Sequence, residues 1–307
     1  MSRVTRIKAF LDYMFPLSLY VPGGVATFFA GYLATYAIAG VENIQITLAA
    51  GIGAVSTVLF MLLMRLYDEL KDVETDLRLG KAGDPRFKDR PIVTGAVLKE
   101  DIVFLRWLVT GILVFINLFL INTIAIYPFV VMFVVGWLSF KWFFIPAISK
   151  NLLLALITHN PIAILQIAYV IGIFASIEGV NNLVMDHLYL VVALWLHVAA
   201  WETSRKIRLP ADETDYQTYS SMLGWRLATL MPLIFSVLSS VCLGVLTIKG
   251  LFPIWFLMVL IVVTSVVVLK CLLLLFLPTT KRTLLKPVIE GYLLVVNFGL
   301  IVASLLA

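Results

Sequence analysis

The feature that most constrains this chain is a series of long segments without a charged residue. These segments are residues 13–41, 43–64, 107–140, 151–177, 227–248 and 250–269. Each is long enough for the roughly 20 residues that a helix needs to cross a bilayer. A soluble domain is about one quarter charged, whereas 13% of these 307 residues are charged and 62% are apolar. We therefore expect an all-α, polytopic membrane protein.

The segment of residues 107–140 is too long for one helix. As a single helix it would measure about 51 Å, against a hydrocarbon core of about 30 Å. It therefore predicts two helices, with a turn around Asn122, Thr123, Tyr127 and Pro128. Residues 183–201 and 287–307 predict two further spans, which makes nine transmembrane helices in a single domain of residues 1–307.

Basic residues fall unevenly on the two sides of such a bundle. With nine spans, 22 of the 23 Lys and Arg residues lie on the side of the N-terminus, and Lys249 alone lies on the other. The positive-inside rule then predicts a cytoplasmic N-terminus and a C-terminus on the opposite side, in the plasma membrane if the source is prokaryotic. The topology thus accounts for the net charge of +5. We expect the chain to lie in a lipid bilayer and to bind neither a nucleic acid nor an obligate protein partner.

Two polar connections, residues 65–106 and 202–226, lie on the basic side and are expected to cap a site. The first begins with Asp68, Asp72 and Asp76, whose spacing of four residues places them on one face of a helix. Like charges at this spacing repel each other, and Mg²⁺, which prefers carboxylates together with substrate phosphates, would offset the repulsion. The alternative is a solvated helix whose acids are screened by Lys71 and Arg78.

The second connection begins where the sixth span ends. Glu202 and Lys206 are four residues apart and follow Trp201 directly, so they place a second polar helix face at the same side of the membrane. Because two polar helix ends are expected on the same side, a merely solvated helix is a less favoured explanation of the acids at 68, 72 and 76.

At these residues the chain resembles the UbiA superfamily of intramembrane prenyltransferases. That family has nine transmembrane helices and two Asp-rich motifs, after helices two and six. Its first motif, N-D-x-x-D-x-x-x-D, is matched by Asp68-Glu69-x-x-Asp72-x-x-x-Asp76, and an Arg90-Pro91 pair follows as in the family's loop. The resemblance implies nine helices around a central cavity.

The second motif departs from the family's D-x-x-x-D, because Lys206 stands where an acid is usual. Either Lys206 contacts a diphosphate directly, which we favour, or a second metal site has been lost.

The resemblance also implies a set of site residues. Mg²⁺ would be held by Asp68, Asp72, Asp76 and Glu202, and with Lys206 these residues would promote departure of the diphosphate from an isoprenyl diphosphate. Cations on the same side are candidates for binding phosphate oxygens: Arg65, Lys71, Arg78, Lys141 and Arg205.

Four further residues are candidates for substrate binding. Tyr67 and Trp201 could face an allylic cation, although an interfacial aromatic belt explains such residues equally. His159 and Asn160 could bind an acceptor or supply a base within helix five. The alternative is that they belong to a kink at Pro161.

Three functions remain open. The first is a Mg²⁺-dependent prenyltransferase that moves the prenyl group of an allylic isoprenyl diphosphate to a lipophilic acceptor, for which an aromatic compound is one candidate. The second is a terpene cyclase of the same fold, in which the cation is attacked by its own double bonds and no acceptor is needed. A remote third is a transporter, but transporters place ionisable groups near the membrane midplane, whereas these acids cluster at one edge.

Overall fold

The computed structural model describes residues 1–142, 144–214 and 216–307, and every regular element in these ranges is a helix. The long helices are α2 (Leu17–Ala39), α3 (Leu48–Lys81), α5 (Lys99–Asn117), α6 (Ile126–Trp142), α9 (Ile162–Glu178), α10 (His187–Ser204), α12 (Trp225–Ile248), α13 (Ile254–Phe276) and α14 (Lys286–Leu305). Shorter helices are α1 (Arg3–Met14), α4 (Pro91–Thr94), α7 (Pro146–Ser149), α8 (Leu152–His159) and α11 (Tyr219–Leu223). Short 3₁₀ segments are η1 (Leu118–Leu120), η2 (Val180–Asn182), η3 (Pro210–Asp212) and η4 (Thr280–Thr283).

Seven helical segments in the described ranges are long and apolar enough to cross a membrane. They are α2, α3, α5 with η1, α8 with α9, α12, α13, and η4 with α14. Helix α6 is also apolar but has 17 residues, and α10 has 18 residues and carries Glu202 in its last turn. The polytopic all-α class is thereby confirmed, whereas the number nine stays a prediction.

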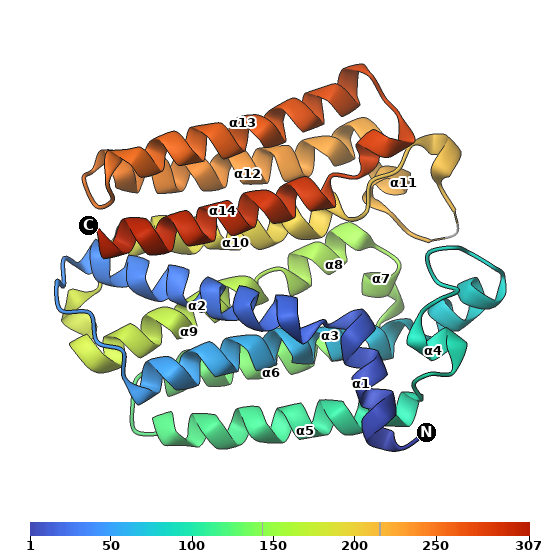
Figure 1. The fold of residues 1–307 in the computed structure, drawn as a ribbon, viewed down its shortest axis with the longest axis horizontal. Coiled ribbons are helices and arrows are strands. Elements are labelled where there is room, and N and C mark those ends of the chain that lie inside the picture. Colours follow the sequence, from blue (N-terminus) through green and yellow to red (C-terminus); the bar gives the residue numbers. More distant parts are fainter. Residues whose placement is uncertain (143, 215) are drawn as a thin grey trace.

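The long helices lie side by side in one bundle (Figure 1). Most pack against their neighbours in the chain: α10 on α12, α12 on α13, α2 on α3 and α3 on α5. The last helix, α14, packs on α2, which brings the end of the chain back to its beginning. The two termini lie at opposite ends of the bundle (Figure 1), as an odd number of crossings requires.

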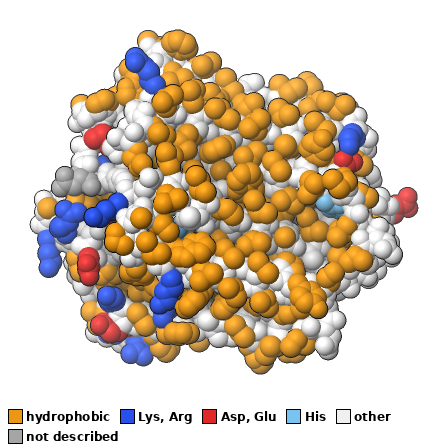
Figure 2. All heavy atoms as spheres, turned by 180° about the vertical axis from the view of Figure 1, so that it is seen from behind, with side chains coloured by type: hydrophobic (Ala, Val, Ile, Leu, Met, Phe, Trp, Pro, Cys, Tyr) orange, Lys and Arg blue, Asp and Glu red, His pale blue; other side chains and the backbone are white. Residues whose placement is uncertain are grey.

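The surface of the bundle suits a bilayer. Hydrophobic side chains cover most of the face in Figure 2, and charged side chains gather mainly at one edge of that view. Some buried polar groups on neighbouring helices bond to each other. Asn117 donates to Ser56 Oγ at 2.8 Å and accepts from the Tyr169 hydroxyl at 2.6 Å, which joins α5, α3 and α9. Such bonds remove the cost of polar groups in an apolar interior.

The expected break within residues 107–140 is confirmed, with a shift in its position. Helix α5 ends at Asn117, η1 continues to Leu120, and α6 begins at Ile126. Tyr127 and Pro128 therefore lie in the first turn of α6 and not in the connection. Proline is well tolerated in a first helical turn because its missing N–H has no helical partner there.

The N-terminal helix α1 was not predicted from the sequence. The charge-free segment 13–41 contains a boundary, because α1 ends at Met14 and Pro16 precedes α2. Proline disfavours a helical conformation in the residue before it, here Phe15. Helix α1 is fixed to the start of α5 by Arg6, whose guanidinium donates to both carboxylate oxygens of the buried Asp101 at 2.6 and 2.8 Å.

Candidate active site

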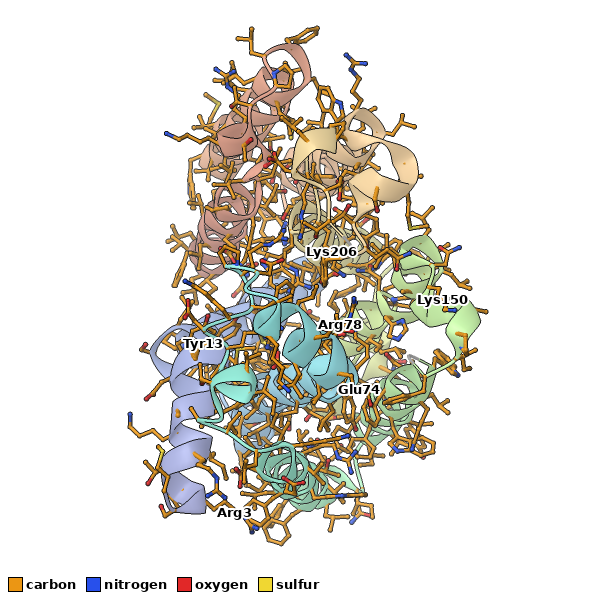
Figure 3. All side chains as sticks on the ribbon, turned by 90° about the vertical axis from the view of Figure 1, so that its right-hand side faces the viewer. Arg3, Tyr13, Glu74, Arg78, Lys150 and Lys206 are labelled. Carbon is orange, nitrogen blue, oxygen red and sulfur yellow. The ribbon has the colours of Figure 1, made fainter. Side chains whose placement is uncertain are left out.

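The two polar motifs meet at one end of the bundle, which we call the carboxylate end. Helix α3 has 34 residues, so at about 51 Å it exceeds a 30 Å hydrocarbon core and its last turns extend beyond it. The last turn of α10 lies at the same end. Figure 3 looks onto this end and shows Lys206 and Arg78 near its middle, whereas Arg3 lies at its rim.

Four acids of α3 form two rows. In the buried row, Glu69 is ion-paired with Arg65, and Asp76 is ion-paired with Arg90 from the following connection. Glu69 is 4% exposed and Asp76 is 1% exposed. A buried carboxylate needs such a partner, because removing a lone charge from water costs several kcal/mol.

The open row consists of Asp68 and Asp72, with Lys71 between them. Lys71 Nζ lies 3.6 Å from Asp68 Oδ1 and 3.7 Å from Asp72 Oδ1. The two carboxylates keep 38% and 34% of their surface exposed. The expected single face of Asp68, Asp72 and Asp76 is thus divided, since Asp76 belongs to the buried row.

The second motif is a compact group of one acid and two bases. Lys206 Nζ lies 3.0 Å from Glu202 Oε1, and an Arg205 guanidinium nitrogen lies 2.5 Å from Glu202 Oε2. Burial raises the pKa of Glu202, but the charges of Arg205 and Lys206 outweigh it and hold this pKa at about 2. Burial lowers the pKa of Lys206, but Glu202 outweighs that effect and raises it above the usual lysine value. All three groups are therefore charged at neutral pH.

The open row faces the second motif. Lys71 helps to lower the pKa of Glu202, and Asp68 helps to raise that of Arg205. The structure thus brings together three acids and three bases from two helix ends: Asp68, Asp72, Glu202, Lys71, Arg205 and Lys206. An added anion such as a diphosphate could bind these bases only by competing with the acids for them, or together with a cation.

The two connections also touch each other above this site. Arg86 of the first donates to the Thr214 hydroxyl of the second at 3.3 Å, and Arg208 donates to the same hydroxyl at 2.9 Å. The rings of Phe87 and Tyr216 lie 5.7 Å apart. These contacts fit the prediction that the connections cap a common site.

The acids at this end offer Mg²⁺ a pair of carboxylates. Among the described residues no three His, Cys, Asp or Glu side chains form a group that could hold a metal ion. Asp76 accepts a hydrogen bond from Arg90 and Glu202 lies 3.0 Å from Lys206 Nζ, so neither is available without breaking a close ion pair. Asp68 and Asp72 are more exposed, and the ammonium of Lys71 lies 3.6 and 3.7 Å from them. Because Mg²⁺ is commonly bound by one or two carboxylates together with substrate phosphates, this pair fits the ion without a preformed cage.

Other predicted residues are engaged within the fold. Tyr67 is buried and stacks on Phe140 with ring centroids 4.5 Å apart, and Lys141 lies over the Trp137 ring at 5.6 Å. The indole N–H of Trp201 donates to Glu290 Oε1 at 3.1 Å. Arg78, on the last turn of α3, is exposed and points into the carboxylate end (Figure 3).

His159 and Asn160 lie at the break between α8 and α9. His159 Nδ1 lies 2.7 Å from the Ala155 carbonyl, and Nε2 lies 2.9 Å from the Ser139 carbonyl of α6. The side-chain oxygen of Asn160 accepts from the indole N–H of Trp195. These bonds match the kink alternative, in which neighbouring groups bind to the polar atoms around Pro161.

Sequence reasoning missed the roles of Glu69, Arg90 and Glu290. Glu69 occupies the second position of the first motif, and its helical spacing from Asp76 was the signal for a shared face. Arg90 was noted only as part of an Arg-Pro pair. Its partner lies 14 residues away across a turn, and helical periodicity cannot predict such a contact.

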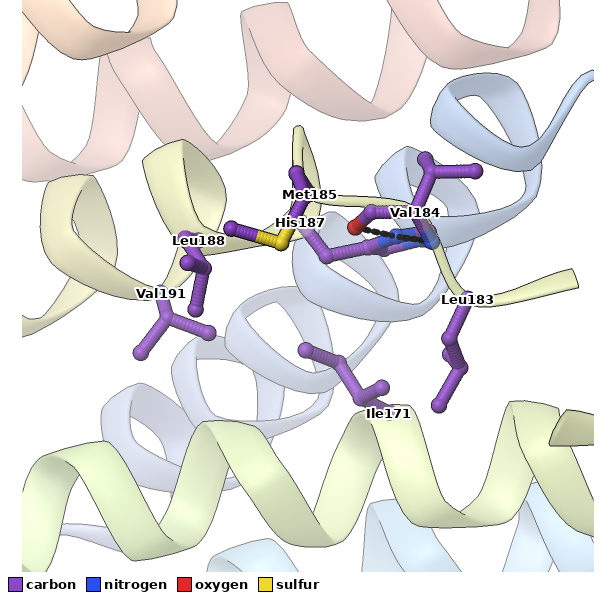
Figure 4. Close-up of a pocket in the computed structure, with 7 residues that line it drawn as sticks. All are labelled: Ile171, Leu183, Val184, Met185, His187, Leu188 and Val191. Atoms are coloured by element: carbon purple, nitrogen blue, oxygen red, sulfur yellow. Dashed lines mark hydrogen bonds between the residues drawn. The ribbon is translucent and has the colours of Figure 1, made fainter.

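A pocket lies at the other end of the bundle (Figure 4). It has a volume of about 360 Å³ and is lined by apolar side chains of α9, α10 and the connection between them, with His187 as its polar member. His187 and Glu202 occupy opposite ends of α10, about 22 Å apart along the helix, so this pocket is separate from the carboxylate end. The expected central cavity stays a prediction.

Comparisons with known proteins agree with the fold. No family model matches the chain, and no curated protein matches its sequence. Among solved structures, a digeranylgeranylglyceryl phosphate synthase is similar with a TM-score of 0.64 and 14% identity, over 98% of this chain and 99% of that one. A UbiA homologue from Aeropyrum pernix K1 is similar with a TM-score of 0.63 and 17% identity, over 90% of this chain and 97% of that one. The expected resemblance to UbiA proteins is confirmed at the level of the fold.

Proposed function

We propose that the chain is a Mg²⁺-dependent intramembrane prenyltransferase with nine transmembrane helices. It would ionise an allylic isoprenyl diphosphate and transfer the prenyl group to a lipophilic acceptor. The observation that carries this proposal is the meeting of the open row with the second motif at one end of a UbiA-type fold. Acids and bases that alternate there suit a site where a diphosphate and a divalent cation bind together.

The reaction breaks the C–O bond between the allylic carbon and the diphosphate. The acceptor carbon forms a new C–C bond and loses a proton, while the diphosphate leaves as an anion. Mg²⁺ held by Asp68 and Asp72 would act as a Lewis acid on the leaving group. Asp76 and Glu202 remain candidate ligands, but each would first have to release its basic partner.

Lys206 and Arg205 would bind phosphate oxygens as the negative charge develops. Fixed donors of this kind lower the barrier because they are in place before the charge appears. Lys71, Arg65, Arg78 and Lys141 are the further candidates for phosphate binding. The acids lie at one end of the bundle and not at mid-depth, which argues against the transporter alternative.

The direct test is turnover with defined donors. Purified protein in detergent is incubated with Mg²⁺ and C10, C15 or C20 allylic diphosphates, with and without a phenolic or quinone-precursor acceptor. Diphosphate release and a prenylated product only with the acceptor would support transfer. A cyclic hydrocarbon or terpene alcohol without an acceptor would support the cyclase instead. No release from any donor under either condition would reject both.

A further inference from the structure

Arg90 reaches the acids of α3 from outside that helix. Its guanidinium is ion-paired with Asp76 and lies 4.6 Å from the centre of the Phe87 ring. Asp76 is 1% exposed, so Arg90 provides its charge compensation within the protein. Arg90 also directly precedes α4, which begins at Pro91.

The backbone around Arg90 is held close to α3. Gly80 faces Val93 of α4 so tightly that a β-carbon on Gly80 would lie 2.5 Å from a Val93 methyl carbon. This close packing fixes the start of α4 and therefore the point from which Arg90 reaches Asp76. Each acid of the buried row consequently has one arginine partner: Arg65 for Glu69, and Arg90 for Asp76.

We propose that Arg90 is a positioning residue that acts as a built-in counter-ion for Asp76 and thereby limits the diphosphate-bound site to one divalent cation, held at the open row. The inference rests on the proposed function, since it concerns the metal that would accompany the diphosphate. A divalent ion on Asp76 would have to displace Arg90 and leave its guanidinium without a carboxylate in a partly buried position, which is costly.

The open row differs from the buried row in its exposure. The side chains of Asp68 and Asp72 keep 38% and 34% of their surface exposed, against 2% for that of Asp76. Lys71 Nζ lies 3.6 and 3.7 Å from the two carboxylates, whereas Arg90 donates a hydrogen bond to Asp76. A cation can therefore reach Asp68 and Asp72 from solvent without displacing a hydrogen-bonded arginine.

The test counts metal ions and does not depend on turnover. Full-length protein in detergent is saturated with geranylgeranyl thiolodiphosphate, whose bridging sulfur resists ionisation, and titrated with Mn²⁺ followed by electron paramagnetic resonance. We expect one bound Mn²⁺ per chain for the wild type and for Arg90→Lys. We expect two for Arg90→Gln, because Asp76 is then free to bind a metal ion. The double variant Arg90→Gln/Asp76→Asn should return to one.

Two Mn²⁺ ions in the wild type, or one in a folded Arg90→Gln, would overturn the inference. If Arg90→Gln does not fold, Asp76→Asn gives the decision: it should keep one Mn²⁺, and loss of that ion would show that Asp76 is a ligand. A wild type that binds neither this C20 analogue nor the C10 and C15 thiolodiphosphates would instead reject the proposed function itself, so the two failures are distinguishable.

Discussion

At the scale of single residues, Lys206 is the point at which the second motif differs from the UbiA motif that the sequence resembles. Its ammonium is 3.0 Å from Glu202. A metal on Glu202 would have to displace this ammonium. Lys206 thus compensates the negative charge of Glu202, as Arg90 compensates that of Asp76. The ammonium of Lys206 remains able to donate a hydrogen bond to a phosphate oxygen.

We expect Lys206→Ala to lower turnover by roughly 10²–10³-fold, because one fixed donor at a developing charge is lost. Diphosphate release at saturating donor is the measurement. Lys88→Ala is the matched control, since Lys88 is an exposed lysine of the other connection, and its turnover should match the wild type. Lys206→Asp restores an acid beside Glu202, and raised Mg²⁺ should recover part of its activity. An unchanged rate in Lys206→Ala would remove this residue from the site.

The raised pKa of Lys206 predicts a pH dependence. A lysine whose pKa is higher in the folded than in the unfolded state stabilises the fold fully below the unfolded value, about 10.4, and loses this effect as the pH rises through the folded value. The difference in melting temperature between wild type and Lys206→Gln should therefore stay constant from pH 6 to pH 9. Thermal unfolding in detergent measures it, and a difference that shrinks steadily over this range would contradict the raised pKa.

At the scale of elements, packing decides what the sequence pattern leaves open. The spacing of Asp68, Asp72 and Asp76 correctly placed them on one helix that continues past the membrane. It could not show that Asp76 is covered by the connection that follows, because that contact depends on how α4 packs on α3. Similarly, composition showed an uncharged segment at 13–41, but only Pro16 marked the boundary that separates α1 from α2.

Gly80 offers a test of this packing. Gly80→Ala should push α4 away from α3 and destabilise the protein by about 1–3 kcal/mol, as overpacking typically does. The double variant Gly80→Ala/Val93→Ala should recover most of the loss, since the side chain that the new methyl meets has been shortened. Gly111→Ala is the control, because Gly111 lies in helix α5 with no atom within 4 Å of a β-carbon. Thermal unfolding compares the four proteins, and equal melting temperatures for Gly80→Ala and wild type would contradict the close contact.

At the scale of the whole molecule, the fold class and the meeting of the two polar motifs at one end of the bundle could be predicted, whereas the partner of Asp76 could not. Charge-free segments reveal membrane helices because the bilayer excludes unpaired charges. The same logic places polar motifs at helix ends, so the meeting of Asp68 with Arg205 followed from two helices that end on one side. The pairs of Arg65 with Glu69 and of Lys206 with Glu202 are four residues apart, within reach of helical spacing. The pair of Asp76 with Arg90 spans 14 residues across a turn, and periodicity contains no information on it.

The orientation of the bundle is the last property to test. Cys242 and Cys271 are replaced by alanine, and single cysteines are introduced at the exposed positions Ala82, Ala211 and Met185. The first two lie in the connections at the carboxylate end, and Met185 lies in the pocket lining at the other end. None of these three changes alters a charge. They therefore preserve the distribution of Lys and Arg on which the predicted orientation depends.

A membrane-impermeant maleimide should label Met185→Cys in intact cells, and Ala82→Cys and Ala211→Cys only in inverted vesicles. The physical reason is the strong asymmetry of basic residues. At the far end Lys249 is ion-paired with Asp186 at 2.5 Å, so its single charge is locally compensated. Labelling of both Ala82→Cys and Ala211→Cys in intact cells would reverse the orientation and place the proposed diphosphate site outside the cytoplasm. Labelling of only one of them would place the two connections on different sides and would contradict the contact between Arg86 and Thr214.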